Sequence, residues 1–139
     1  MRFLDTNIIV DVLGSTGSID SASARWSVGR YGDALEMGAV VCNLVVLAEL
    51  TGRARDPATI LDALTDHEID LLDITPAAAF HAGQAFRLYR QRGGPRQAIL
   101  PDFLIAGHAA SAGATLVTRD RRLQSYFPDL SLITPDTHP

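Results

Sequence analysis

Short apolar runs alternate along the chain with longer segments in which apolar residues recur every three or four positions. Runs such as AVVC and IDLLDI are typical of strands buried in a parallel sheet. The pattern predicts five such strands, at residues 2–5, 39–42, 69–74, 114–118 and 130–134. Because parallel strands are joined by long crossover connections, we expect a helix between most consecutive strands.

The longer segments carry the signals that begin and end helices. Caps are expected at Thr6 or Asn7 and at Asn43, and stops at Gly14, Gly38 and Gly52. With the apolar spacing, these signals predict helices at residues 6–14, 20–37, 43–52, 57–67, 75–92, 101–112 and 119–127. In the helix at 75–92, one core-facing side is expected from Ala79, Ala82, Phe86 and Tyr89.

The alternation continues from one end of the chain to the other without a repeat, a low-complexity tract or a linker. Residues 15–18 and the stretch GGPRQ are expected to be loops. We therefore predict a single α/β domain over residues 1–139, with a central parallel sheet of about five strands flanked by helices on both faces. No apolar run approaches the roughly 20 residues of a membrane span, and MRFLDTN lacks the layout of a signal peptide, so we expect a cytoplasmic protein with no membrane partner.

Four acidic residues fall near the carboxyl ends of the predicted strands. Asp5 ends the first strand, and Glu49 lies in the helix after the second. Asp102 begins the helix before the fourth strand, and Asp120 follows that strand. Because open parallel sheets bind ligands beyond the carboxyl ends of their strands, we expect these side chains to meet, with Glu49 pointing inward toward the sheet edge.

Such a cluster needs electrostatic compensation. Taken singly, each acid has a simpler role, as a helix cap, a charge at a helix start or a surface charge. Together they must bind protons or cations, since two like charges about 5 Å apart repel by roughly 3 kcal/mol at an effective dielectric constant near 20. Oxygen ligands without thiolates or paired imidazoles suit Mg²⁺ or Mn²⁺ and not Zn²⁺. Such ions, one or two of them, indicate phosphodiester or phosphoryl chemistry with a metal-activated water.

The charge balance changes this picture little. Twelve basic and sixteen acidic residues give a net charge of −4, which argues against a dedicated nucleic-acid binder unless the four clustered acids are neutralised by cations. Every basic residue is Arg, for which compositional bias is the simpler explanation, although Arg also suits phosphate contacts. Two groups are candidates to face RNA or to be solvated helix-end charges: Arg119, Arg121 and Arg122, and Arg87, Arg90, Arg92 and Arg96.

The cysteine, the histidines and the tryptophan do not indicate a second reactive site. Cys42 lies in a predicted buried strand, which favours a small core residue over a reactive thiol. The four histidines do not pair at a spacing typical of metal ligands. Trp26 is interpreted as a packing anchor.

Four sequence blocks, LDTNII, LAEL, PDFLIAGHA and TLVTRD, occur in this order and resemble the signature blocks of PIN-domain ribonucleases. The resemblance extends over nearly the whole chain. Within that superfamily the segments TRDRRL, YFPDL and LITP are similar to those of the VapC toxins of bacterial toxin–antitoxin pairs.

The resemblance implies that Asp5, Glu49, Asp102 and Asp120 form an acidic site for Mg²⁺ or Mn²⁺. It also implies that Asn7 and Thr118 support the metal ligands or orient the substrate. A protein of this family is expected to be an endoribonuclease that cleaves RNA with a metal-activated water. It is further expected to form a homodimer and to be silenced by a cognate antitoxin, a segment of which enters the acidic groove.

Three other classes of protein are alternatives to this assignment. Aspartate-based phosphatases and response-regulator receivers normally use a lysine, and this chain has none. Flap-type DNA nucleases need additional helical elements to grip a duplex. A catalytically inactive PIN-like module that binds RNA or protein is the remaining alternative, and a test of RNA cleavage separates it from the enzyme.

Overall fold

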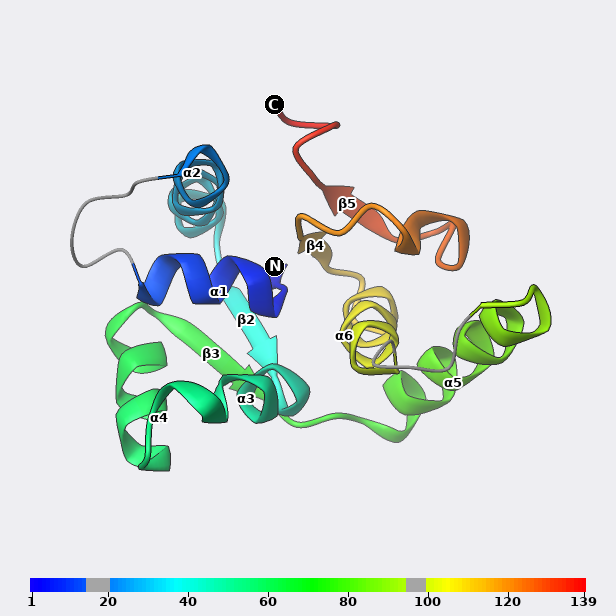
Figure 1. The fold of residues 1–139 in the computed structure, drawn as a ribbon, viewed down its shortest axis with the longest axis horizontal. Helices are drawn as coiled ribbons and strands as arrows, with labels where there is room; N and C mark the ends of the chain where they lie inside the picture. Colours follow the sequence, from blue (N-terminus) through cyan, green and yellow to red (C-terminus); the bar gives the residue numbers. More distant parts are fainter. Residues whose placement is uncertain (15–20, 95–99) are drawn as a thin grey trace.

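The computed structural model, drawn as a ribbon in Figure 1, describes residues 1–14, 21–94 and 100–139. These residues contain a sheet of five strands. The strands are β1 (Arg2–Leu4), β2 (Val40–Asn43), β3 (Ile69–Leu72), β4 (Thr115–Val117) and β5 (Ser131–Ile133). They lie in the order β3-β2-β1-β4-β5, and every neighbouring pair is parallel. The predicted loop at 15–18, the predicted helix start at Asp20 and Arg96 in GGPRQ lie outside the described residues.

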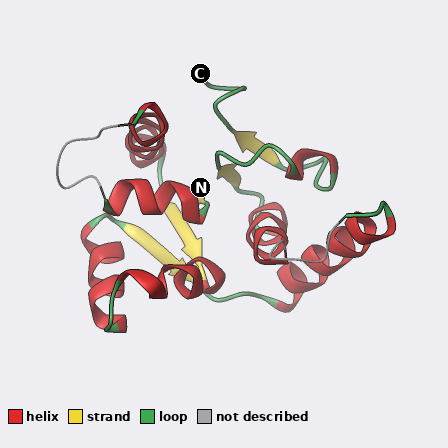
Figure 2. Cartoon of the chain, viewed as in Figure 1, coloured by secondary structure: helices red, strands yellow, loops and turns green. Residues whose placement is uncertain are grey.

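Helices occupy the connections between the strands (Figure 2). In the described parts of the chain they are α1 (Thr6–Leu13), α2 (Ala22–Met37), α3 (Leu44–Leu50), α4 (Pro57–Asp66), α5 (Pro76–Gln91) and α6 (Leu100–Ser111). The predicted α/β domain with a parallel five-stranded sheet is therefore confirmed. None of the described helices is long and apolar enough to cross a membrane.

The central strands are short and apolar because both of their faces are covered. Phe3 and Leu4 of β1 pair with Leu116 and Val117 of β4, and all four side chains are fully buried. Burial on both faces is what a continuous apolar run without alternation indicates. β1 therefore anchors the centre of the sheet, and the residue that follows it, Asp5, is carried to the sheet's carboxyl edge.

The first helix begins at Thr6, as predicted, but its cap is not one of the two expected residues. Asp5 is its cap, since the Asp5 carboxylate accepts a hydrogen bond from the backbone N–H of Thr6 at 2.7 Å. The expected caps, Thr6 and Asn7, are wrong because β1 passes into α1 without a loop and both residues already have helical geometry. Asn43 does cap α3 as expected, by accepting hydrogen bonds from two backbone N–H groups.

The helix expected at 119–127 is absent, and that segment contains only a short 3-10 turn, η2 (Leu123–Ser125). The Asp120 side chain takes up the backbone N–H of Arg122, which a helix would have used, and Pro128 disfavours helical geometry at Phe127. Leu123 and Phe127 still reach the core from this irregular segment. This irregular segment connects β4 to β5, which pairs with β4 in parallel.

Two smaller expectations are also corrected. Ala79 is exposed, and the fully covered side of α5 is formed by Ala78, Ala82 and Ala85, with Phe86 and Tyr89 partly buried beside them. α3 ends at Leu50, and Gly52 lies in a 3-10 turn, η1 (Thr51–Arg53), instead of ending the helix.

Helices α5 and α6 lie side by side at one end of the molecule (Figure 1) and approach closely at Gly107. A Cβ atom at Gly107 would lie 2.7 Å from the Cβ of Ala82 and 2.8 Å from its Cα. We expect Gly107→Ala to lower the free energy of unfolding by about 1 to 3 kcal/mol, because two helix backbones must separate. Urea denaturation measures this change.

Gly83 provides the matched control on α5, since no atom lies within 4 Å of a Cβ built there. Gly83→Ala is expected to raise stability by up to about 1 kcal/mol, because Ala is the better helix former. Equal changes at the two positions would contradict the close helix contact as the cause.

Candidate active site

The topological switch point of the sheet lies between β1 and β4, at the carboxyl ends of these strands. β1 connects to β2 on one side, whereas β4 connects to β5 on the other. In open parallel sheets, ligands bind in the crevice where neighbouring strands lead away in opposite directions. Asp5 follows β1 at this edge, and Thr118 and Asp120 follow β4.

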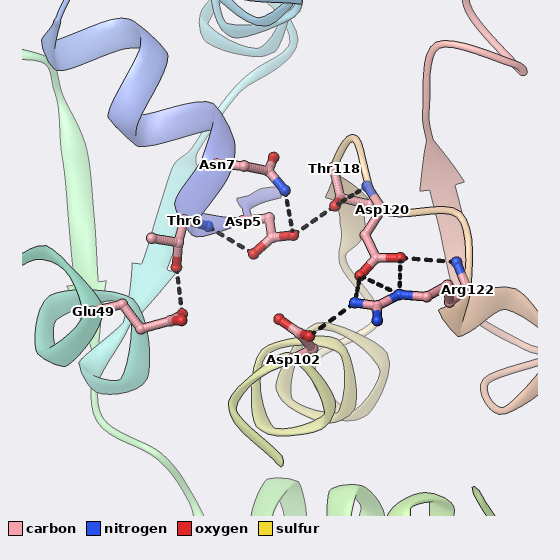
Figure 3. A network of polar contacts seen from close by, with 8 residues as sticks. All are labelled: Asp5, Thr6, Asn7, Glu49, Asp102, Thr118, Asp120 and Arg122. Atoms are coloured by element: carbon pink, nitrogen blue, oxygen red, sulfur yellow. Dashed lines mark hydrogen bonds and ion pairs between the residues drawn. The ribbon is translucent and has the colours of Figure 1, made fainter. Parts of the chain in front are cut away.

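The four predicted acids approach this edge from four elements (Figure 3). Asp5 lies at the start of α1, Glu49 near the end of α3, Asp102 in the first turn of α6 and Asp120 in the loop after β4. Figure 3 shows them arranged around one opening, with Asp5 at its base. The structure therefore places the four side chains at one edge of the sheet, and their role as metal ligands stays a prediction.

Asp5 is held rigidly. Its side chain is 5% exposed, and the Oδ1 atom accepts from the Thr6 backbone. The Oδ2 atom accepts from Nδ2 of Asn7 at 3.1 Å and from Oγ1 of Thr118 at 2.5 Å. The fully buried Thr118 hydroxyl also accepts from the backbone N–H of Asp120 at 2.9 Å. Thr118 thus connects two of the acids.

The hydrogen bonds only partly offset the electrostatic cost of Asp5. Burial raises the pKa of its carboxyl, and the charges of Glu49 and Asp120 raise it further, while the bonds from Thr118 and Thr6 act in the opposite direction. The net pKa stays above its ordinary value. A carboxylate with three donors and a raised pKa favours an additional positive charge nearby.

Asp102 experiences the same environment. Burial raises its pKa from 3.8 to about 6, with further contributions from the charges of Asp5, Asp120 and Glu49, while Arg122 lowers it. The mutual influence of these carboxyls shows that they lie within electrostatic range of one another.

Asp102→Asn is therefore expected to stabilise the protein in the presence of a chelator. Between about pH 4 and pH 6 the folded state binds more protons at Asp102 than the unfolded state, so stability falls as the pH rises and the full penalty applies above pH 6. We expect a gain of about 1 to 2 kcal/mol at pH 7.5, less than the full pKa shift implies, because Asp102 is 23% exposed and solvent screens its charge.

Thermal unfolding at two pH values measures this effect. The gain should fall to about a third at pH 4.5 and vanish only well below pH 3.8, where Asp102 is protonated in the unfolded protein as well. Asp62→Asn, an exposed change on α4, is the control and should show no pH-dependent gain. A gain for Asp102→Asn that is the same at both pH values would argue against this cause.

Glu49 differs from expectation. It is exposed, so the prediction that it points inward is wrong, because Val46 and Leu50 occupy the buried side of this short helix. It nevertheless joins the site from the rim, where its Oε1 accepts a hydrogen bond from Oγ1 of Thr6 at 2.7 Å. The orienting role of Thr6 was not predicted, although its position directly after Asp5 is a usable signal.

Arg122 lies between Asp102 and Asp120 (Figure 3). Burial acts to raise the pKa of Asp120, but the side-chain and backbone hydrogen bonds from Arg122 and its charge hold that pKa below the ordinary value. The hydrogen bonds to Asp120 in turn raise the pKa of Arg122. The two neighbouring arginines are paired elsewhere: Arg119 with Asp11 at 3.1 Å, and Arg121 with Asp136 at 2.9 Å.

The donor set fits a hard divalent cation. Carboxylate and hydroxyl oxygens surround the opening, and such ligands suit Mg²⁺ or Mn²⁺. In the positions that the described side chains take, however, no three His, Cys, Asp or Glu groups are close enough together to hold an ion. A cation at these positions would be held by one or two carboxylates and would complete its coordination with water, as Mg²⁺ usually does.

A buried polar contact behind the site was also not predicted. Asn43, which is fully buried, donates from Nδ2 toward Nδ1 of His108 at 3.2 Å and toward the backbone oxygen of Leu104 at 3.5 Å. The Oδ1 atom of Asn43 already accepts two backbone N–H groups, so Nδ1 of His108 is the acceptor. This contact ties the start of α3 to α6, the two helices that carry Glu49 and Asp102.

Two other residues singled out in the sequence, Cys42 and Trp26, contribute to packing. Cys42 is buried, and burial raises the pKa of its thiol to about 12, so the interpretation as a core residue is confirmed. Trp26 donates to the backbone oxygen of His138 at 2.6 Å, as a packing anchor would. Arg87 and Arg90 line an open hollow of about 420 Å³ on α5, and their contact with RNA stays a prediction.

Comparisons with known proteins agree with this fold. The family model of the PIN domain matches residues 2–127. No curated protein sequence matches the chain.

Several solved structures have the same fold. VapBC2 of Rickettsia felis, bound to a DNA fragment from its promoter, is 22% identical with a TM-score of 0.71, covering 96% of this chain and 97% of that one. DNA-bound VapBC of Salmonella typhimurium is 20% identical with a TM-score of 0.69, covering 96% of both chains. FitAcB of Neisseria gonorrhoeae is 20% identical with a TM-score of 0.63, covering 100% of both chains.

Proposed function

Because the chain belongs to the PIN domain family, we propose that it is a divalent-cation-dependent endoribonuclease and the toxin of a VapC-type toxin–antitoxin pair. The observation that carries this proposal is the meeting of Asp5, Glu49, Asp102 and Asp120 at the switch point of the sheet. A bound cation would stabilise carboxyls that raise each other's pKa, and phosphodiester cleavage is the chemistry that carboxylate-held Mg²⁺ or Mn²⁺ supports.

The four acids would hold the cation. When bound, it would help to deprotonate an attacking water and would stabilise negative charge on the phosphate. Asp5 supplies the fixed point of the site, because three hydrogen bonds and near-complete burial leave its carboxylate one orientation. Asp102 and Asp120, which are 23% and 14% exposed, approach from the helix and loop opposite.

The surrounding side chains orient these acids and the substrate. Thr118 and Asn7 orient Asp5, and Thr6 orients Glu49. The exposed guanidinium groups of Arg121 and Arg122 are candidates to contact the phosphates of an RNA strand, and Arg119 is a third candidate at the same edge.

The partners we propose are an antitoxin and a second copy of the chain. Two further solved structures with this fold are a toxin–antitoxin complex from Klebsiella pneumoniae and a member of the VapBC family of toxin–antitoxin systems from Mycobacterium tuberculosis, which supports a cognate antitoxin here. An acidic opening suits a segment that carries a positive side chain. Homodimer formation rests on the resemblance to VapC toxins.

The test of the proposal is cleavage of a circular RNA by the purified chain. A circle has no ends, so its conversion to a linear product reports internal cleavage alone. We expect conversion with Mn²⁺ or Mg²⁺ and none with excess chelator. Total cellular RNA provides a second substrate, so that a narrow sequence preference does not hide the activity.

A non-catalytic PIN-like module is the second candidate, and the contact of Arg122 with two of the acids favours it. This module would bind RNA or protein without cleavage in any metal. RNA binding that is unaffected by metal, together with intact circular and cellular RNA, would establish the module and exclude the enzyme.

A further inference from the structure

Arg122 contacts two of the four acids through a geometry stronger than an ordinary surface ion pair. Its Nη2 lies 2.6 Å from Oδ2 of Asp120, and its Nε lies 3.0 Å from Oδ1 of the same carboxylate. The same Nη2 lies 3.3 Å from Oδ2 of Asp102, which comes from α6. The guanidinium therefore spans the two acids with several charge-assisted hydrogen bonds.

The position of Arg122 allows it to leave. Its side chain is 63% exposed, whereas those of Asp102 and Asp120 are 23% and 14% exposed. The guanidinium thus approaches from the solvent side and can rotate outward without unpacking the core. Its neighbours cannot replace it where they stand, because Arg119 pairs with Asp11 and Arg121 pairs with Asp136.

We propose that Arg122 competes with the divalent cation for the carboxylate oxygens of Asp102 and Asp120. This inference rests on the proposed function, because it concerns the same acids. A guanidinium and a divalent ion on the same oxygens would repel each other strongly, so one excludes the other. The cation must displace Arg122, and the protein consequently binds cations more weakly than its four carboxylates would by themselves.

A purely structural role gives a different expectation. If Arg122 only fastens the loop after β4 to α6, its removal loosens Asp102 and Asp120 and weakens cation binding. If it competes, its removal strengthens cation binding. The sign of the change in affinity separates the two roles without a measurement of catalysis.

The test compares Arg122→Ala with Arg121→Ala. Both variants lose one positive charge in neighbouring positions, but Arg121 pairs with Asp136, outside the acidic site. Each protein is treated with a chelator, dialysed and titrated with Mn²⁺, and the free ion is followed by electron paramagnetic resonance. We expect about tenfold tighter binding for Arg122→Ala and a change within about twofold for Arg121→Ala.

Thermal unfolding gives a second readout. The rise in Tm caused by saturating Mn²⁺ should be larger for Arg122→Ala than for the wild type. Arg122→Gln, which keeps hydrogen-bond donors without the charge, should also bind Mn²⁺ more tightly and serves if the alanine variant does not fold.

Unchanged or weaker Mn²⁺ binding by the Arg122 variants would overturn the competition, as would equal tightening in Arg121→Ala. Cleavage of circular RNA by the wild type is scored separately. If the wild type cleaves RNA but the Arg122 variants do not bind Mn²⁺ more tightly, the proposed function stands and the competition is rejected. If the variants bind Mn²⁺ more tightly but the wild type does not cleave RNA, only the proposed function is rejected.

Discussion

Asp5→Asn is expected to lower the rate of RNA cleavage at least about a hundredfold while the protein stays folded. The substitution keeps the size of the side chain and one oxygen that can cap α1, although its amide nitrogen cannot accept the hydrogen bonds that Oδ2 of Asp5 accepts. It removes the negative charge at the base of the site, where fixed charges commonly contribute factors of a hundred or more to a rate. Cleavage of circular RNA in Mn²⁺ measures the loss.

Asp56→Asn is the matched control for this change. Asp56 also caps a helix, α4, by accepting a hydrogen bond from the Ala58 backbone at 2.9 Å, but it is exposed and lies outside the acidic cluster. We expect a wild-type rate for this variant, and a Tm for Asp5→Asn that stays above the assay temperature. A wild-type rate for Asp5→Asn, or a loss that merely follows unfolding, would argue against Asp5 as part of the reaction site.

Thr118→Val is expected to reduce the cleavage rate by about tenfold to a hundredfold and to lower stability by about 1 to 3 kcal/mol. Valine keeps the shape of the fully buried side chain but lacks the hydroxyl that donates to Asp5 and accepts from Asp120. The buried carboxylate of Asp5 and the backbone N–H of Asp120 would each lose a hydrogen-bond partner. Initial rates and chemical denaturation measure the two effects.

Thr118→Ser separates the hydroxyl from the rest of the side chain. Serine keeps the donor and acceptor and loses only a methyl group, so its cleavage rate should lie within a few fold of the wild type even where stability falls. If the serine variant loses as much activity as the valine variant, packing and not the hydroxyl accounts for the role of Thr118.

The sheet and the positions of the acids could be predicted because they depend on local sequence. A buried parallel strand is a continuous apolar run, and the residue after it must lie at the sheet's carboxyl edge. The positions of Asp5 and Asp120 follow from that rule. The orientation of the Glu49 side chain could not be predicted, because the seven-residue helix α3 offers too few positions to fix which side faces the core.

The arrangement of the arginines could not be predicted for a different reason. Arg119, Arg121 and Arg122 are nearly adjacent in sequence, yet their partners Asp11, Asp136 and Asp102 come from three distant parts of the chain. Only the tertiary structure decides which guanidinium reaches which carboxylate. The contact between Asn43 and His108 behind the site depends on the same long-range packing.

The most direct test of the central claim is calorimetric titration of Mn²⁺ into the wild type and the double variant Asp5→Asn/Asp102→Asn. If acids from separate elements form one cation site, the wild type binds Mn²⁺ saturably and the double variant binds it at least about tenfold more weakly, with an intact fold. Equal affinity in the two folded proteins would contradict the account.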